Sequence, residues 1–367
     1  MTLTDIDGAK TPGSGILPGI QYLRGFAAIL VVIWHGNWLI SIPPSYGYSP
    51  FNLAEMGLFG VAIFFVISGF IITIVSLGPE RASLGEFFAR RFVRIIPFMW
   101  VCVAAYNLIS FAASGRPDPG PALRAMTLWP IGELRPHVVW TLRHEFIFYI
   151  LFALTMLRAR PRPLILAAWF VAPVLWYAAA RCWSPGLLQP DDTIAALLAV
   201  VLYGNVMMPN LQFGAGFGLG LLWLNSSKAV RPLLSPAFSI TLGATIACTA
   251  LVGVMLSEND GLRALGWTLF ATIVVWLGIV STDRGGPLHV LGMLLGNASY
   301  SIYLSHALVL VVLIQGSARM HNPLPAWLFL TAAVLSSIVA GVVIHWYVEQ
   351  PLVGYLRRLG RRPSIAT

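Results

Sequence analysis

The sequence predicts an all-α fold: a polytopic transmembrane helical bundle with about ten transmembrane helices, one of them broken or kinked. Three observations support this prediction. Of the 367 residues, 57% are hydrophobic and 10% are charged, whereas soluble domains carry roughly 25% charged residues. Apolar stretches of about 18 residues or more recur along nearly the whole chain. The segments between them are mostly short and hold the basic side chains, as loops at a membrane surface do.

The apolar runs give the individual helices. In chain order, we expect transmembrane helices at 19–40, 57–77, 93–113, 139–158, 163–181, 193–224, 237–257, 264–281, 288–316 and 325–348. The run at 193–224 is too long for one straight span, and it contains Pro209 and four closely spaced glycines. Such residues kink or break membrane helices, so this run is either one broken helix or two short ones.

The net charge of +9 is explained by topology. Basic groups at 81–94, 158–162, 228–231 and 357–362 fall on one side of the membrane if 193–224 crosses once. The positive-inside rule then places both termini in the cytoplasm, and anionic lipids account for the basic surplus without a nucleic-acid partner. The expected organisation is a cytoplasmic segment at 1–18, a membrane domain at 19–351 and a basic cytoplasmic tail at 352–367.

The cysteines of the sequence indicate neither a disulfide nor a metal site. The three cysteines, Cys102, Cys182 and Cys248, are far apart and show neither a disulfide framework nor metal-ligand spacing. We therefore expect no metal site and no tightly bound cofactor.

Arg24 and His35 are the most informative polar residues in the membrane. They are eleven residues apart, which places them on one face of a helix, roughly 16 Å apart along its axis. Arg24 alone is explained as an anchor at the membrane surface, and His35 alone by a hydrogen bond between helices. Their shared face favours a joint role.

Two further segments carry candidate ligand-binding residues. Arg91 and Arg94 are three residues apart on one helix face, with Arg90 adjacent. This cluster is either a positive-inside signal or a clamp for phosphates, whose oxygens suit guanidinium groups. Ser68 and Gly69 form a small pair within an apolar run, suited to close helix packing or to lining a cavity.

The segment WTLRHEF at 140–146 contains the acid with the strongest case for burial in the membrane, Glu145. It forms an ion pair, or it is a carboxylate that orients a histidine or holds a sugar hydroxyl. Trp140 would stack on a sugar ring or belong to the aromatic belt of the interface. Tyr300 and His306, further along the chain, would each line a cavity.

Six motifs in this order resemble the acyltransferase 3 family of integral membrane acyltransferases, from Arg24 to Pro351. They are Arg-x10-His at 24–35, G-x-F-G-V-x-I-F-F-V-I-S-G-F at 57–70, R-R-F-x-R-I-x-P at 90–97, W-T-L-x-x-E followed by F-x-F-Y at 140–149, S-Y-x-x-Y-L-x-H at 299–306, and V-E-x-P at 348–351. The sequence around Glu145 resembles that of the branch of the family that acetylates exopolysaccharides and lipopolysaccharides.

The resemblance implies a ten-helix core in the bacterial inner membrane. It implies acyl-coenzyme A, usually acetyl-coenzyme A, as the donor substrate and a hydroxyl of a cell-surface or exported glycan as the acceptor. His35 matches the family's essential histidine, with Arg24 as its partner, and Glu145 matches its carboxylate. Arg91 and Arg94 match the pair that holds the coenzyme.

The remaining matches are less specific. Arg90 and Ser68 would complete the donor site, and Tyr300, His306 and Trp140 the acceptor site. The expected partners are acyl-coenzyme A, a glycan and membrane lipids, and the sequence is compatible with an oligomer.

The mechanism and the class of protein both have alternatives. His35 would act as a general base on the acceptor hydroxyl, or it would carry the acyl group covalently across the membrane. A transporter or flippase of a lipid-linked glycan would also bury polar groups and contain a broken helix. Against a transporter, no twofold repeat of hydropathy is visible. The other superfamily of membrane-bound O-acyltransferases also uses a buried histidine, but its asparagine and histidine context is not seen here.

Overall fold

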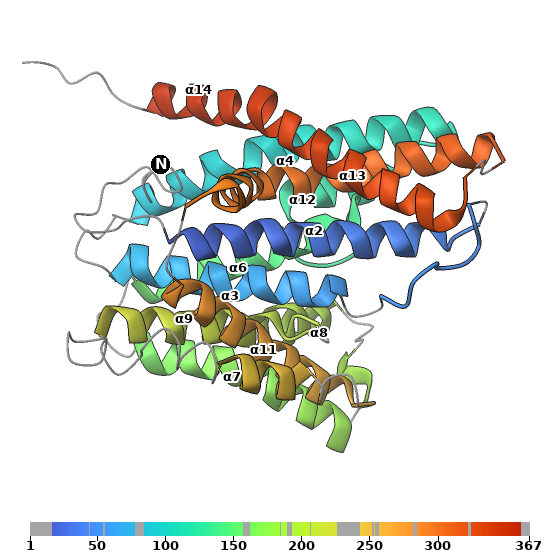
Figure 1. Cartoon of the computed structure of the whole chain (residues 1–367). Coiled ribbons are helices and arrows are strands. Elements are labelled where there is room, and N and C mark those ends of the chain that lie inside the picture. The colour runs from blue at the N-terminus through green and yellow to red at the C-terminus, as the bar shows by residue number, and fades with distance from the viewer. Residues whose placement is uncertain are drawn as a thin grey trace, which may run out of the picture.

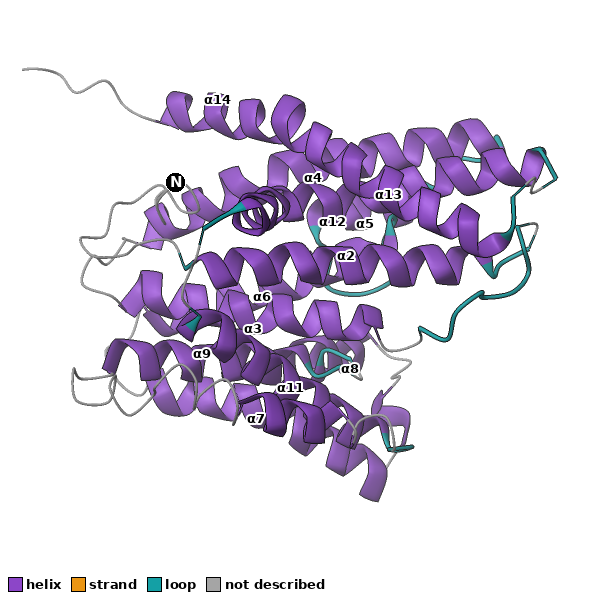
Figure 2. Cartoon of the chain, in the orientation of Figure 1, coloured by secondary structure: helices purple, strands orange, loops and turns teal. Residues whose placement is uncertain are grey.

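The computed structural model describes residues 17–43, 45–53, 56–77, 84–156, 162–183, 185–188, 193–205, 207–225, 243–251, 253, 257–281, 285–321 and 324–360. These ranges contain helices and loops and no strand, as Figure 2 shows. Eight of the described helices are long and apolar enough to cross a membrane. The prediction of an all-α, multi-pass membrane bundle is therefore confirmed.

The predicted spans correspond to helices whose ends differ from the expectation by a few residues, apart from the four exceptions given below. The first half of the chain forms α2 (Pro18–Ile40), α3 (Met56–Leu77), α4 (Leu84–Ser114), α5 (Pro119–Thr127), the 3-10 turn η1 (His137–Val139), α6 (Trp140–Met156) and α7 (Arg162–Cys182). The second half forms the 3-10 turn η2 (Pro185–Leu188), α8 (Thr193–Leu198), the π-helical turn η3 (Ala199–Tyr203), α9 (Pro209–Asn225), a helix at 243–251, α11 (Asp260–Val280), α12 (Pro287–Arg319), α13 (Ala326–Ile344), the π-helical turn η5 (His345–Glu349) and α14 (Gln350–Gly360).

Two helices extend beyond the apolar runs that predicted them. α4 begins at Leu84 rather than at 93, and α14 continues the last span to Gly360. Both extensions carry arginines, and α14 is strongly amphipathic, so the helix continues where hydropathy falls. Of the span predicted at 237–257, only 243–251, 253 and 257 lie in the described ranges. The terminal residues 1–16 and 361–367 lie outside them.

Helix α2 lies at the centre of the bundle (Figure 1). It contacts α12, α3, α13 and α11. Small residues allow these helices to approach closely, as in other membrane bundles. A Cβ atom added at Gly25 of α2 would lie 2.8 Å from the Cβ of Leu295 on α12, and one added at Gly296 would lie 2.3 Å from the carbonyl oxygen of Gln21.

Helices α3 and α9 also pack backbone against backbone. An added Cβ at Gly69 would lie 2.2 Å from the carbonyl oxygen of Phe213, and one at Gly216 would lie 2.0 Å from that of Val66. Gly69 therefore packs on α9, while its neighbour Ser68 lines a cavity. Of the two roles predicted for this pair, close helix packing therefore applies to Gly69 and cavity lining applies to Ser68.

The span predicted at 193–224 is broken, as expected. α8 and η3 end at Tyr203, and α9 begins at Pro209 after Gly204 and Met208, which have φ angles of +81° and +51°. At the break, the Val201 carbonyl accepts hydrogen bonds from Trp169 Nε1 at 2.8 Å and Asn210 Nδ2 at 3.0 Å. The glycines at 214–220 do not form the break, because they lie inside α9.

Two clusters of arginines lie at one end of the bundle, although Arg116, Arg124, Arg135 and Arg263 lie elsewhere in the described chain. The beginnings of α2 and α4 and the ends of α9 and α14 lie together there, on the left in Figure 1. Arg90, Arg91 and Arg94 on α4 and Arg357 and Arg358 on α14 belong to this part of the chain. We call it the basic end. The predicted basic residues Arg81, Arg158, Arg160, Lys228, Arg231, Arg361 and Arg362 lie outside the described residues.

Candidate active site

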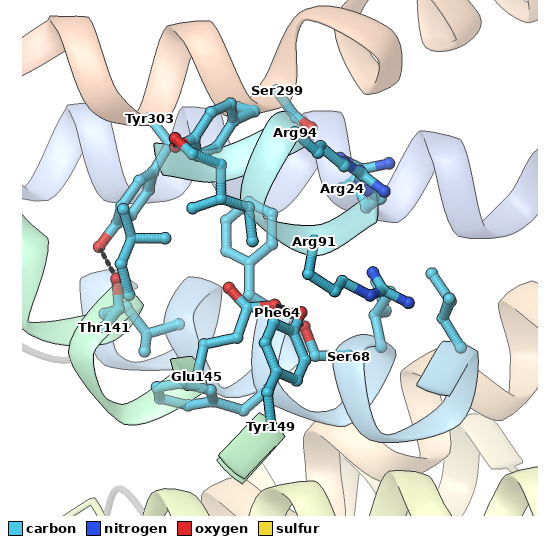
Figure 3. Close-up of a pocket in the computed structure, with 17 residues that line it drawn as sticks. Arg24, Phe64, Ser68, Arg91, Arg94, Thr141, Glu145, Tyr149, Ser299 and Tyr303 are labelled. Carbon is cyan, nitrogen blue, oxygen red and sulfur yellow. Dashed lines mark hydrogen bonds between the residues drawn. The ribbon is translucent and has the colours of Figure 1, made fainter. Parts of the chain in front are cut away.

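A cavity of about 100 Å³ lies between α2, α3, α4, α6 and α12, in the half of the bundle near the basic end. Figure 3 shows its lining: arginines on one side, a tyrosine and a threonine on the other, and a carboxylate between them. We call it the arginine cavity. Six residues of the predicted site line it: Arg24, Ser68, Arg91, Arg94, Glu145 and Tyr300.

Glu145 is held by two hydroxyl groups. Ser68 of α3 donates a hydrogen bond to Glu145 Oε1 at 3.0 Å, and Tyr149 donates a short one to the same oxygen. Thr141, Glu145 and Tyr149 are spaced by four residues, so one face of α6 presents all three to the cavity. Oε2 accepts no hydrogen bond from the described residues and is available to a ligand.

Three guanidinium groups and one carboxylate, Glu145, are the charged groups of the cavity lining in the described chain. Arg91 is 6% exposed, and its guanidinium carbon lies 5.3 Å from the ring centre of Tyr149 and 5.8 Å from that of Phe87. Arg24 is 9% exposed and donates to Gln21 Oε1 at 3.4 Å. A cavity with this excess of positive charge is suited to an anion, and the rings fix Arg91 in place.

The far side of the cavity is formed by aromatic and hydroxyl groups of α3, α6 and α12. The Tyr303 hydroxyl donates to the Val138 carbonyl at 3.0 Å and shares a hydrogen bond of 2.8 Å with Thr141. Tyr300 donates to the Ile95 carbonyl at 2.8 Å. The ring of Phe64 meets that of Tyr303 at 5.7 Å between centres. Phe64 and Tyr303 therefore close this side of the cavity.

His35 lies outside the arginine cavity, toward the opposite end of α2. Its ring centre is 5.0 Å from that of His306, which in turn lies 5.9 Å from that of Tyr303. Tyr303 and His306 thus separate His35 from the cavity. His35 Nδ1 is 3.0 Å from the Val31 carbonyl. Because a carbonyl only accepts, Nδ1 carries the hydrogen, and Nε2 of the neutral ring is left as an acceptor.

The other predicted residues occupy different surroundings. Arg90 does not line the cavity and forms an ion pair with Glu86. Trp140 packs edge-on against Phe65 and His144. His306 is fully buried, and its Nε2 has no hydrogen-bond partner in the described part of the chain.

The sequence analysis did not select four polar residues that the structure places in the cavity wall: Thr141, Tyr149, Ser299 and Tyr303. A signal for two of them was present, because Thr141 and Tyr149 flank Glu145 at four-residue spacing. Tyr303 shares a helix face with Ser299, and Ser299 also lines the cavity. The spacing predicts which residues share a helix face, but it does not predict which polar residues of that face reach the cavity.

Comparison with known proteins gives a family match. Residues 17–346 match a family model described as an acyltransferase domain. The exopolysaccharide production protein ExoZ of Rhizobium meliloti (strain 1021) is 30% identical, over 83% of this chain and 92% of that protein. The acyltransferase MdmB of Streptomyces mycarofaciens is 24% identical, over 96% of this chain and 94% of that protein. The O-acetyltransferase OatA of Staphylococcus aureus (strain NCTC 8325 / PS 47) is 24% identical, over 92% of this chain and 57% of that protein.

No solved structure matches the chain. The family match includes every helix that lines the arginine cavity, and these relatives do not favour a transporter. The chain therefore belongs to the acyltransferase 3 family and is a multi-pass membrane O-acyltransferase.

Proposed function

We propose that the protein transfers an acyl group, most simply acetyl, from acyl-coenzyme A to a hydroxyl of a cell-surface or exported glycan. The observation that carries the proposal is the arginine cavity, in which three guanidinium groups face one carboxylate. Coenzyme A is anionic, and guanidinium groups bind phosphate oxygens in pairs. A volume of about 100 Å³ is too small for the nucleotide head, which would stay at the mouth, and has room only for the reactive end of the thin pantetheine arm. The names of ExoZ and OatA support a glycan acceptor and an acetyl group.

In the direct reaction, the acceptor hydroxyl attacks the thioester carbon. The new C–O bond forms, the C–S bond breaks, and the coenzyme leaves as a thiol once it has taken up a proton. His35 would accept the hydroxyl proton at Nε2, which the hydrogen bond from Nδ1 to Val31 leaves available. In the alternative, His35 first takes the acyl group and then gives it to the hydroxyl.

Both versions require the acyl group to pass the rings that close the cavity. Phe64 and Tyr303 lie at that side, and His306 lies between Tyr303 and His35. We propose that these rings move when the donor binds. The carboxylate of Glu145 would orient the incoming thioester arm through Oε2, and Arg24 would join Arg91 and Arg94 in holding the phosphates.

The orientation follows from the same charges. We propose that the basic end faces the cytoplasm of the bacterial inner membrane, with both termini on that side. The donor would then reach the arginine cavity from the cytoplasm, where acyl-coenzyme A is made.

The deciding experiment compares His35→Ala with His321→Ala, a matched control at an exposed histidine near the end of α12. With acetyl-coenzyme A and a glycan acceptor, His35→Ala is expected to lower the transfer rate by about 10²–10⁴-fold, the usual contribution of a general base. His321→Ala is expected to retain transfer. Equal rates in both variants and the unsubstituted protein would exclude His35 from the chemistry. No thioester cleavage with any acyl-coenzyme A would overturn the donor assignment.

A further inference from the structure

A second and larger cavity lies near the end of the bundle opposite the basic end. It has a volume of about 450 Å³, within the range of small-molecule sites, against about 100 Å³ for the arginine cavity. Its walls come from the first turn of α6, the last third of α7, η3 with the break that follows it, and the start of α11. We call it the tyrosine cavity, after Tyr177 and Tyr203.

Arg143 brings an uncompensated charge to this cavity. Its Nε is buried and has no hydrogen-bond partner in the described chain. Its NH1 group donates to the Gly132 carbonyl at 3.2 Å, and no described carboxylate lies within ion-pair distance. The nearby acid of the lining, Asp260, is paired with Arg263. A half-buried guanidinium whose Nε is buried without a partner is suited to a ligand that supplies an anionic oxygen.

The other polar groups suit a sugar. Tyr203 is 5% exposed, and Tyr177 is fixed by a hydrogen bond of 3.1 Å to Asn259 Oδ1. Asn205 accepts a hydrogen bond from Met207 N at 2.8 Å, so its amide nitrogen keeps two hydrogens without a partner in the described residues. Two aromatic rings with an amide and a guanidinium give apolar faces and a few directional donors, as carbohydrate hydroxyls and rings require.

The two cavities lie on either side of one helix. Thr141, Glu145 and Tyr149 of α6 line the arginine cavity, whereas Arg143 lines the tyrosine cavity. The turn η1 before α6 accepts a hydrogen bond from Tyr303 at the Val138 carbonyl, and ring contacts through His306 connect Tyr303 to His35. A ligand in the tyrosine cavity would therefore approach the region of His35 from the end opposite the donor.

We propose that the tyrosine cavity binds the acceptor glycan, and that Arg143 selects a sugar bearing a carboxylate. This inference rests on the proposed function, because it assigns the second substrate of the same reaction. The chemical class is an acidic oligosaccharide, with the carboxylate on Arg143 and the sugar rings against Tyr177 and Tyr203.

The test is a binding measurement on the full-length protein in phosphatidylcholine nanodiscs, by calorimetry or ligand-observed NMR. The probes are cellobiuronate and cellobiose, which differ in one carboxylate. The unsubstituted protein is expected to bind cellobiuronate at least about tenfold more tightly. Equal or undetectable binding of the two sugars would overturn the proposal without any variant having to fold.

Variants assign the preference to the cavity. Arg143→Gln is expected to abolish the difference in affinity between cellobiuronate and cellobiose. Arg143→Lys is expected to keep part of that difference. Arg181→Gln, at an exposed arginine one turn after Tyr177 on α7, is the matched control and is expected to keep all of it. Tyr177→Ala is expected to weaken both sugars. An unchanged preference in Arg143→Gln would overturn the assignment.

A lipid headgroup could offer Arg143 the same anionic oxygen. The measurement is therefore repeated with phosphatidylglycerol in the nanodiscs, and loss of cellobiuronate binding there would overturn the proposal in favour of a lipid site. Sugar binding needs no coenzyme, so its failure alongside intact acetyl-coenzyme A turnover would leave the proposed function standing. If acetyl-coenzyme A turnover failed while sugar binding was intact, the proposed function would be overturned and the sugar site would stand.

Discussion

At the scale of single residues, the carboxylate of Glu145 is the most tightly specified group of the candidate site. Ser68 and Tyr149 both donate to Oε1, from two different helices, and this fixes the plane of the carboxylate. Oε2 remains open to a ligand. Glu145 therefore joins α3 to α6 and also presents one oxygen to the cavity.

Glu145→Gln tests this role. The amide keeps the shape and can still accept from Ser68 and Tyr149, so the protein is expected to fold and to bind coenzyme A. Acyl transfer is expected to fall by about tenfold or more, because a neutral amide presents a weaker acceptor to the substrate. Ser68→Ala, which removes one of the two donors, is expected to have a smaller effect. Transfer at the wild-type rate in Glu145→Gln would remove Glu145 from the site.

The three arginines of α4 give a graded comparison. Arg91 and Arg94 line the cavity, whereas Arg90, directly beside Arg91, pairs with Glu86 outside it. Arg91→Ala and Arg94→Ala are each expected to weaken coenzyme A binding by about tenfold or more, through the loss of charge-assisted hydrogen bonds to phosphate. Arg90→Ala is expected to weaken it less. Binding constants from calorimetry decide, and a reversed order would contradict the assignment of the clamp.

At the scale of the elements, α3 positions the site because one of its faces packs on α9 without side chains between the backbones. Gly69 and Gly216 lie at that contact. Ser68, the neighbour of Gly69, is thereby held toward Glu145. The break after Tyr203 lets the same span contribute both α9 to this contact and η3 to the tyrosine cavity.

Two glycines of α9 provide a matched test of this packing. A Cβ at Gly216 would lie 2.0 Å from the Val66 carbonyl oxygen, whereas one at Gly218 would meet nothing within 4 Å. Gly216→Ala is expected to lower stability by about 1–3 kcal/mol, because overpacking separates the helices. Gly218→Ala is expected to be neutral or slightly stabilising. Thermal unfolding in detergent measures both, and equal melting temperatures would contradict the contact.

At the scale of the whole molecule, the two cavities lie toward opposite ends of one bundle. The arginine cavity belongs to the half with the basic end, and the tyrosine cavity to the other half. Under the proposed function, this arrangement would let the donor and the acceptor reach the protein from opposite sides of the membrane.

The orientation can be measured with the protein's own thiols. Cys182 is exposed at the end of α7, opposite the basic end, Cys102 is buried, and Cys248, which is also exposed, is replaced by serine throughout. A membrane-impermeant maleimide is expected to label the protein in intact spheroplasts, and Cys182→Ser is expected to remove that label. Arg358→Cys, placed on α14 in the Cys182→Ser background, is expected to react only after the membrane is disrupted. The opposite pattern would show that the basic end faces outward.

The sequence by itself determined the class of fold, the positions of most helices, the break before Pro209 and the family. Each of these depends on local properties: hydropathy over one span, helix-breaking residues, and the spacing of motifs. It also determined which residues share a helix face, such as Arg91 with Arg94 and Glu145 with residues four positions away. A helix fixes such spacing without reference to its neighbours.

Only the tertiary structure decided which faces meet. Ser68 and Glu145 are 77 residues apart and Thr141 and Tyr303 are 162 apart, and no periodicity in the chain pairs them. It also decided that Arg24 enters the cavity while His35, on the same face of α2, lies behind Tyr303 and His306. Spacing fixes the direction of a side chain about its own helix axis, but the rotation and depth of each neighbouring helix come from packing of the whole bundle.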